Sequence, residues 1–349
     1  MTSQRAEGDP PKAVLVLLAF AAIYFLWGST YLAIRYAVET LPPLVMSGTR
    51  SLLAGAMLLF AAGRRLRNVR PEHWVSAALA GGLLFLGGHG LLSWAEQRVS
   101  SGAAALVLAT IPAWMVLLRW LHSRQPSNWR MLSGLALGFI GVAMLSPLGI
   151  ADGGALPLVP LMALVASSAS WAAGSLYARR ALLPDHAGLS AGMQLVAGGV
   201  WLMVAAGVSG EWGRIEVSEV SQRSVVSLFY LICFGSLVAF SAYNWLIRVV
   251  DPALVGSYAF VNPLVAVVLG WLIGGEVIGW ATVIATGVIV AGIVLINCAG
   301  ADTKLSRTHR IVCQAGIDDY QTKPGDISRT FERRSELRVS SRLDKTVSG

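Results

Sequence analysis

Ten apolar stretches of about 20 residues each recur along the chain, and this feature limits the possible folds more than any other. A helix rises about 1.5 Å per residue, so about 20 residues cross a hydrocarbon core of about 30 Å. Only 13% of the residues are charged, roughly half the usual share in soluble domains. Helices satisfy their own backbone groups in lipid, and the sequence lacks the alternating pattern of membrane strands. We therefore predict an all-α integral membrane protein with spans near residues 13–33, 44–63, 74–94, 102–121, 131–149, 157–177, 188–208, 225–245, 252–272 and 278–298.

Positive charge is distributed unevenly between the connecting loops. Arg residues follow the second, fourth, sixth and eighth spans, and four of them lie in the loop 63–73. Loop 149–157 has no positive charge, and loop 209–223 carries three Glu residues. Cytoplasmic loops carry an excess of Lys and Arg, so both termini are expected in the cytoplasm. This placement accounts for the net charge of +8 without a nucleic-acid partner, and we expect none.

The second half of the chain repeats the first. Shifts of 144 and then 151 residues align rare residue types, and the pairs include Trp27 with Trp171, Gly48 with Gly192, Gly55 with Gly199, Trp94 with Trp245, Pro112 with Pro263 and Trp120 with Trp271. Each half holds five spans, so the second half enters the membrane from the opposite side. Inverted repeats are a transporter architecture with the substrate site near the midplane between the halves. We predict ten transmembrane helices arranged as two inverted five-helix repeats around a central cavity.

This duplication divides the chain into four parts. We expect a cytoplasmic segment at 1–12, a first repeat at 13–149, a second repeat at 157–298 and a tail at 299–349. The tail is rich in charged and hydroxyl residues, so we expect it to be cytoplasmic and mostly disordered. Basic segments are drawn to anionic lipid, and a role for the tail at the membrane surface is the alternative. The first span is too long for a signal peptide, and we expect no cleavage.

Four stretches carry a resemblance to a known family: "LWGSTYLAIRYAVETLPPLVMSGTR", "AEQRVSSGAAALVLATIPAW", "SWAAGSLYARR" and "DPALVGSYAFVNPLVAVVLGWLIGGE". In them the chain resembles the EamA branch of the drug/metabolite transporter superfamily, and within it the YedA/PecM-type bacterial exporters. The resemblance covers about residues 12–298. It implies export of amino acids, metabolites or amphiphilic compounds across the bacterial inner membrane. His89 departs from the pattern, because relatives of this type tend to have Asn there.

Polar side chains inside a bilayer are costly and are candidates for function. Arg50 lies about two turns inside the second span, where it would attract a substrate carboxylate, unless it snorkels to the surface or locks a neighbouring helix. Its counterpart in the second half is the neutral Gln194. His89, deep in the third span, is either a proton-responsive cavity residue or a neutral histidine bonded between helices. Glu96 is either a rim ion pair with Arg98 or a proton-coupling carboxylate.

Aromatic residues supply further cavity candidates. Trp27 and Trp171 lie deep in their spans and are related by the repeat, so we expect them to form cavity walls together with Tyr258. Aromatic walls suit the apolar or cationic parts of a substrate. Tyr31 and Trp94 lie near span ends, where they line the cavity or simply anchor a helix at the interface.

Two small polar residues and two prolines complete the candidates. Ser29, two residues after Trp27, is small enough for close packing or for opening space beside a cavity, and Asn262 bonds within its helix or lines the cavity. Pro112 and Pro263 occupy matching mid-helix positions, where each bends its helix and frees a backbone carbonyl. We interpret them as hinges for alternating access, with static shape as the alternative.

The predicted function is that of a secondary transporter that exports small metabolites by alternating access. Its partners are a small-molecule substrate and the lipid bilayer. The three cysteines lack metal or disulfide spacing, and catalytic motifs are missing from the sequence, so we expect no metal, no cofactor and no enzyme. Two alternatives stay open. One is a membrane-embedded enzyme or lipid-processing protein built on Arg50, His89 and Glu96, and the other is a sensory or interaction protein acting through the tail.

Overall fold

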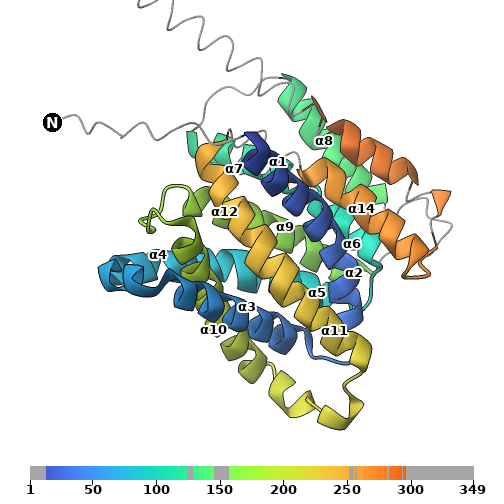
Figure 1. Ribbon diagram of the computed structural model, residues 1–349. Helices are drawn as coiled ribbons and strands as arrows, with labels where there is room; N and C mark the ends of the chain where they lie inside the picture. Colours follow the sequence, from blue (N-terminus) through green and yellow to red (C-terminus); the bar gives the residue numbers. More distant parts are fainter. Residues whose placement is uncertain are drawn as a thin grey trace, which may run out of the picture. The chain divides into compact units, whose positions relative to one another are not determined.

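The structure is a computed structural model that describes residues 13–123, 129–144, 157–250, 255, 258–277, 279–280, 283–292 and 294–295. Within these residues all regular secondary structure is helical, and no strand is present (Figure 1). The expected cytoplasmic segment 1–12 and the expected tail 299–349 lie outside the described residues, as do two of the cysteines, Cys298 and Cys313.

The first half of the chain forms five helical stretches, several of them composed of consecutive segments. They are α1 (Ala13–Ala21), η1 (Ala22–Leu26) and α2 (Trp27–Ala37); α3 (Pro43–Ala62) and η2 (Gly63–Asn68); α4 (Pro71–Gly81), η3 (Gly82–Gly90) and α5 (Leu91–Ala95); α6 (Ser101–Leu108) and α7 (Ile111–Ser123); and α8 (Trp129–Met144).

The second half follows the same plan. Its elements are α9 (Leu158–Ala178); α10 (Ala187–Val208); the short turns η4 (Glu211–Arg214) and η5 (Val217–Glu219); α11 (Gln222–Tyr230), η6 (Leu231–Ala239) and α12 (Phe240–Val249); α14 (Tyr258–Leu272); and a last helix, Val283–Gly292.

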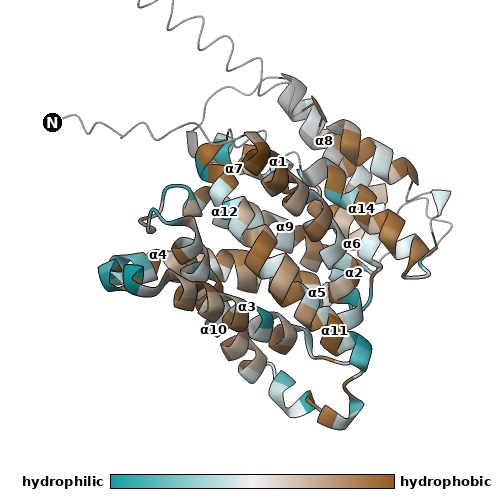
Figure 2. Ribbon diagram, in the orientation of Figure 1, coloured by the Kyte–Doolittle hydropathy of each residue, from teal (hydrophilic) through white to brown (hydrophobic). Residues whose placement is uncertain are grey.

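Seven of these helical stretches are long and apolar enough to cross a membrane, and they coincide with seven of the predicted spans. The other three predicted spans are helical over shorter described stretches, in α8, α14 and the last helix. Figure 2 shows hydrophobic residues along the helices and hydrophilic residues at their ends, for example around η2 and in the region before α11. This is the distribution that a bilayer selects, because charged groups are stable only near the water.

The ends of the helices follow local sequence signals. Pro43 and Pro71 occupy the first positions of α3 and α4, where a missing N–H costs nothing. Ser100 and Ser221 precede α6 and α11, and each side chain accepts a hydrogen bond from a backbone N–H of the first turn. Helix starts are therefore fixed by residues that satisfy or avoid the free N–H groups.

α3 and α10 pack along each other at glycine residues (Figure 1). A Cβ on Gly55 would lie 2.8 Å from the backbone nitrogen of Val196, and one on Gly199 would lie 3.0 Å from that of Leu52. The shift of 144 residues converts the first contact into the second. Reciprocal contacts of this kind are what a two-fold relation between two helices produces.

Three membrane stretches contain a π-helical segment in their middle: η1, η3 and η6. The sequence did not lead us to expect them. The wider π turn displaces carbonyl groups from their usual intrahelical partners, and such turns often occur at functional sites. η3 and η6 lie in the third and eighth spans, at nearly equivalent positions of the two halves.

Side chains from the opposite half of the chain bond the carbonyl groups of each π-helical segment. In lipid these carbonyls have no water to bond, so the donors must come from neighbouring helices. With its amide oriented to donate, Asn262 serves η1, while two serines of α9 serve η3 and Trp27 serves η6. The bonds are Asn262 Nδ2 to Tyr24 O (3.0 Å) and Ile23 O (3.1 Å), Ser167 Oγ to Gly88 O (2.8 Å), Ser170 Oγ to Leu83 O (2.8 Å) and Trp27 Nε1 to Gly235 O (3.1 Å).

The fourth span differs from the prediction of a continuous helix with a proline in its middle. It is divided at Ala109 and Thr110, and Pro112 is the second residue of α7. Proline has no N–H for the carbonyl four residues earlier, so the helix is interrupted at this point. Pro263 does lie inside a helix, α14, as predicted. The two matching prolines therefore occupy different settings.

Candidate functional site

A cavity of about 40 Å³ lies between six of the membrane stretches. A cavity needs about 10–15 Å³ to hold one water molecule, so this cavity has room for a few waters. A larger ligand requires its walls to move apart. The lining residues are Trp27, Thr30, Tyr31, Ile34, Arg50, Gly88, His89, Leu92, Leu108, Ile111, Ser167, Trp171, Tyr258 and Asn262.

The two repeat-related tryptophans meet at this cavity. Trp27 and Trp171 are in an edge-to-face contact, with ring centroids 5.8 Å apart. Tyr243 and Tyr258 pack on the other sides of Trp27, at 5.0 and 5.3 Å. Edge-to-face and tilted geometries are favourable for aromatic rings, so these residues form a stable aromatic wall built from both halves of the chain.

His89 lies in the π-helical segment η3, and its ring stacks on Trp171 at a centroid distance of 5.1 Å. Phe85 contacts the same imidazole edge to face. The imidazole Nδ1 is buried and has no hydrogen-bond partner among the described residues. The ring is therefore held by aromatic packing, and His89 is one of the residues that line the cavity.

Arg50 is only 2% exposed, although it carries a guanidinium group. Its Nε donates to the hydroxyl of Ser236, at 2.8 Å, and its Nη1 has no partner among the described residues. Gly235 leaves room for the guanidinium, because a Cβ there would lie 3.3 Å from Nη2. The snorkelling alternative is wrong, since the side chain is buried beside the cavity instead of reaching the surface.

Two of the nine predicted cavity residues lie elsewhere. Ser29 donates to the carbonyl of Leu26, at 2.8 Å, and its hydroxyl lies 2.6 Å from that of Tyr230. Trp94 is half-buried, with the guanidinium of Arg98 at 5.2 Å from its ring centroid. The structure brings the other seven together around the cavity.

Glu96 is fully buried, and the expected rim ion pair with Arg98 is wrong. Both of its carboxylate oxygens lack a hydrogen-bond partner among the described residues, and Arg98 turns to the ring of Trp94 instead. Arg35 donates to the backbone carbonyl of Glu96, at 2.6 Å. Glu96 is not among the residues that line the cavity shared by Arg50 and His89.

Several residues of the site were missed in the sequence. Ser167 is one turn from Trp171 on the same helix face, so its spacing of four residues was a usable signal. Ser236 and Thr30 carried weaker signals, since single hydroxyl residues are common in membrane helices. The aliphatic lining residues Leu108 and Ile111 carried none.

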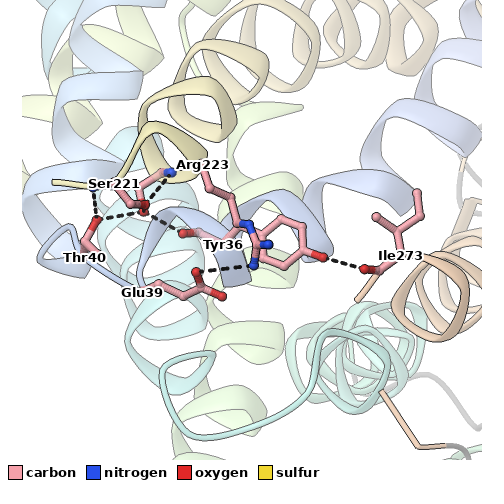
Figure 3. A network of polar contacts seen from close by, with 7 residues as sticks. Tyr36, Glu39, Thr40, Ser221, Arg223 and Ile273 are labelled. Carbon is pink, nitrogen blue, oxygen red and sulfur yellow. Dashed lines mark hydrogen bonds and ion pairs between the residues drawn. The ribbon is translucent and has the colours of Figure 1, made fainter. Parts of the chain in front are cut away.

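A network of polar contacts joins the end of α2 to the start of α11 (Figure 3). The hydroxyl of Thr40 donates to that of Ser224, at 2.8 Å, and accepts from the backbone N–H of Ser221, at 3.1 Å. Ser224 in turn donates to the carbonyl of Tyr36, at 2.8 Å. Every one of these bonds pairs the first half with the second.

Three further contacts belong to this network, and one of them reaches Ile273, the residue after α14 (Figure 3). The Arg223 guanidinium lies over the ring of Tyr36, at 4.7 Å, and 3.8 Å from the carboxylate of Glu39. The Tyr36 hydroxyl donates to the carbonyl of Ile273, at 2.9 Å. The ion pair between Arg223 and Glu39 is exposed and therefore weak. The contact thus depends mainly on the hydrogen bonds to backbone groups.

Carboxylates of the second half bind the N-termini of two helices of the first half. Glu211 accepts from the backbone N–H groups of Leu44 and Val45, at 2.8 and 3.3 Å. Glu276 accepts from the N–H and hydroxyl of Ser101, at 2.8 and 2.7 Å. Helix N-termini favour negative charge. Burial raises the pKa of Glu211, while its two backbone hydrogen bonds act in the opposite direction.

Known proteins match this chain over most of its length. The EamA-like transporter family matches twice, over residues 13–146 and 158–298. The uncharacterized inner membrane transporter YedA of Escherichia coli K12 is 41% identical over 284 residues, covering 80% of this chain and 89% of YedA. The S-adenosylmethionine/S-adenosylhomocysteine transporter of Chlamydia trachomatis serovar L2 is 26% identical, covering 78% of this chain and 86% of that protein. Protein PecM of Dickeya dadantii is also 26% identical, with 78% and 90% covered.

The fold also has a match among solved structures. One crystal structure superimposes with a TM-score of 0.58 at 21% identity, covering 82% of this chain and 98% of the other. At this identity the likeness concerns the fold alone. Together with the apolar helices, the relatives indicate a multi-pass inner membrane protein. The chain belongs to the EamA-like transporter family.

Proposed function

We propose that this protein is a secondary transporter that exports small metabolites, amino acids or amphiphilic compounds, across the inner membrane by alternating access. The family and the transporter-named relatives support transport in general. Export, the substrate class and the mechanism are our proposal. The arrangement of two inverted five-helix repeats, at 13–149 and 157–298, is part of it.

One observation carries this proposal: the cavity is built from both halves, and its central contact joins the repeat-related Trp27 and Trp171. A site placed between two repeats is exposed to either side when one repeat rocks against the other. The reciprocal glycine contacts of α3 and α10 supply a close interface along which such a motion takes place. The cavity is small here because the two halves are close together around it.

The polar contacts between the halves support one closed end. The network around Tyr36 and Thr40, the bonds of Glu211 and the bonds of Glu276 all lie at the helix ends that the charge pattern assigns to the outside. At the opposite end, Arg248 bonds the carbonyls of Pro184 and Asp185 within the second half. We propose that the outer contacts form an external gate and that opening requires their rupture, with bending at Pro112 and Pro263.

Glu96 is the proposed coupling residue. Its buried carboxylate has no hydrogen-bond partner among the described residues, so ionisation is costly and protonation is the favourable way to remove the charge. Opening of the external gate at nearby Ser101 would hydrate Glu96 and let the proton leave. Ionisation would then follow the conformational cycle, as coupling requires.

Flux in proteoliposomes tests the proposal. Vesicles containing the purified full-length protein are loaded with each of the amino acids or with an amphiphilic compound, and counterflow of the labelled compound is measured. We expect saturable counterflow of at least one compound, and a strong loss of it in Trp27→Ala, because the cavity wall is removed. Trp94→Ala is the matched control, since this tryptophan lies away from the cavity, and it should retain the flux. Absence of flux for every compound, with correctly folded protein, would refute the proposal.

A further inference from the structure

Arg50 brings a permanent positive charge to the cavity wall, and no ion pair within 4 Å balances it among the described residues. None of the described residues that line the cavity is Asp or Glu. An ionised Glu96 would act on Arg50 through space, but both oxygens of Glu96 and the Nη1 of Arg50 lack a hydrogen-bond partner among the described residues. Burying an unpaired charge costs free energy, so an anion bound beside Arg50 would stabilise this position.

The other small polar groups of the cavity are already engaged. Thr30 donates to the carbonyl of Trp27, at 2.6 Å, and Ser167 to that of Gly88, at 2.8 Å. The amide of Asn262 serves the carbonyls of η1. These residues therefore have few donors left for a ligand.

The polar atoms that stay free in the cavity wall are donors or can act as donors. They are Arg50 Nη1 and His89 Nδ1, while the indole N–H of Trp171 and the hydroxyl of Tyr258 interact with each other. Guanidinium N–H groups cannot accept, so a ligand must supply acceptor atoms. A carboxylate supplies two such oxygens together with the missing negative charge.

We propose that the cavity contains an anion-binding subsite at Arg50, and that its ligands are small carboxylates with a flat apolar body. The carboxylate bonds Arg50 Nη1, and the flat body lies against the aromatic wall of Trp27, Trp171 and Tyr258. This inference rests on the proposed transport function, because it names the substrate class of the same cavity.

The subsite belongs to only one half of the chain. The repeat counterpart of Arg50 is Gln194, whose amide nitrogen is engaged by Ser190 and Asn244 inside the second half. Gln194 is buried but does not line the cavity. The ligand is therefore oriented, with its charged end toward α3.

Three ligands with the same skeleton and different charge test the inference: 3-phenylpropanoate, 3-phenylpropanamide and 3-phenylpropylamine. Binding to the purified full-length protein in detergent is measured by calorimetry. For the wild-type protein we expect the carboxylate to bind at least tenfold more tightly than the amide, and the amine to bind no better than the amide. In Arg50→Gln the preference for the carboxylate should fall to within about twofold, because the guanidinium that would pair with the carboxylate is gone.

Gln194→Leu is the matched control, since it removes a buried polar group at the equivalent position of the other half and should preserve the preference. A wild-type protein that binds no carboxylate, or that prefers the amide or the amine, would overturn the inference even if Arg50→Gln does not fold. A preference for the carboxylate that survives in folded Arg50→Gln would also overturn the inference.

Flux measurements separate the anion subsite from the transport proposal. Carboxylate binding without flux removes the transport proposal alone, whereas flux of uncharged compounds without a carboxylate preference removes the anion subsite alone.

Discussion

At the scale of single residues, the same side chain type serves different purposes according to its neighbours. Trp27 and Trp171 meet at the cavity, but Trp27 also bonds the π-helical segment η6, whereas Trp94 packs against the core and under the guanidinium of Arg98. Glu211 and Glu96 are both buried carboxylates, but Glu211 has hydrogen bonds from a helix N-terminus and Glu96 has none among the described residues. The role of each of these side chains therefore depends on the groups that it contacts more than on how deeply it is buried.

Glu211 leads to a prediction about stability and pH. Burial raises the pKa of Glu211, so ionisation costs folding free energy at pH 7, and this cost disappears below about pH 4, where the residue is protonated in both states. Glu211→Gln keeps an acceptor for Leu44 without the charge. In thermal unfolding we expect Glu211→Gln to be at least as stable as wild type at pH 7, with the difference vanishing near pH 4. Glu211→Ala loses the acceptor and should be about 1 kcal/mol less stable. Equal losses in the Gln and Ala variants would contradict this account.

Glu96 leads to a prediction about energy coupling. Glu96→Gln preserves the size of the side chain but cannot titrate. We expect counterflow without a gradient to persist in this variant, while the response of transport to an imposed pH gradient is lost. Arg98→Gln is the control, because Arg98 makes no ion pair with Glu96, and it should keep both properties. An unchanged pH response in Glu96→Gln would assign the coupling to another group.

At the scale of elements, glycine and π-helical turns determine how closely the helices approach. The π-helical segments were not expected, because hydrophobicity and periodicity describe them as ordinary helix. They become stable when donors from the opposite half bond their carbonyls, as Asn262 does for η1. The interruption before Pro112 has a related cause. Proline has no N–H, so a carbonyl group one turn earlier is left without its partner within the helix.

The contact of α3 with α10 gives a prediction about packing. Gly55→Val and Gly199→Val each place a side chain against backbone atoms of the other helix, so each should destabilise the protein by about 1–3 kcal/mol. The two losses should be similar, because the contacts are reciprocal. Gly287→Ala is the control, since a Cβ there meets nothing within 4 Å, and it should be neutral or slightly stabilising. Thermal unfolding in detergent measures all three variants, and a harmless Gly55→Val would show that the helices are not in close contact.

At the scale of the whole molecule, the two family matches and the cavity between the halves agree with a transporter built by duplication. Each half supplies one tryptophan to the cavity and glycines to the α3–α10 interface. The halves are not equivalent in charge, since Arg50 corresponds to Gln194. This difference is the basis of the proposed orientation of the ligand, with its charged end toward α3.

Orientation in the membrane is open to a direct measurement. In a variant with the native cysteines replaced, single cysteines at positions 68, 216 and 310 are labelled with an impermeant reagent in intact cells. The charge distribution predicts that 68 and 310 are labelled only after permeabilisation and that 216 is labelled from outside. Labelling of 68 and 216 from the same side would exclude the inverted arrangement.

The sequence by itself determined the membrane class, the places of seven spans and the family, because these depend on hydrophobicity along the chain and on residue patterns that recur in it. It also proposed seven residues that lie at the cavity. Only the tertiary structure decided that Ser29 and Trp94 lie elsewhere, that Glu96 avoids Arg98, and that Ser167 and Ser236 belong to the site. The reason is physical: the rotation of a membrane helix is set by its packing against helices far away in the sequence, and hydrophobicity alone does not specify it.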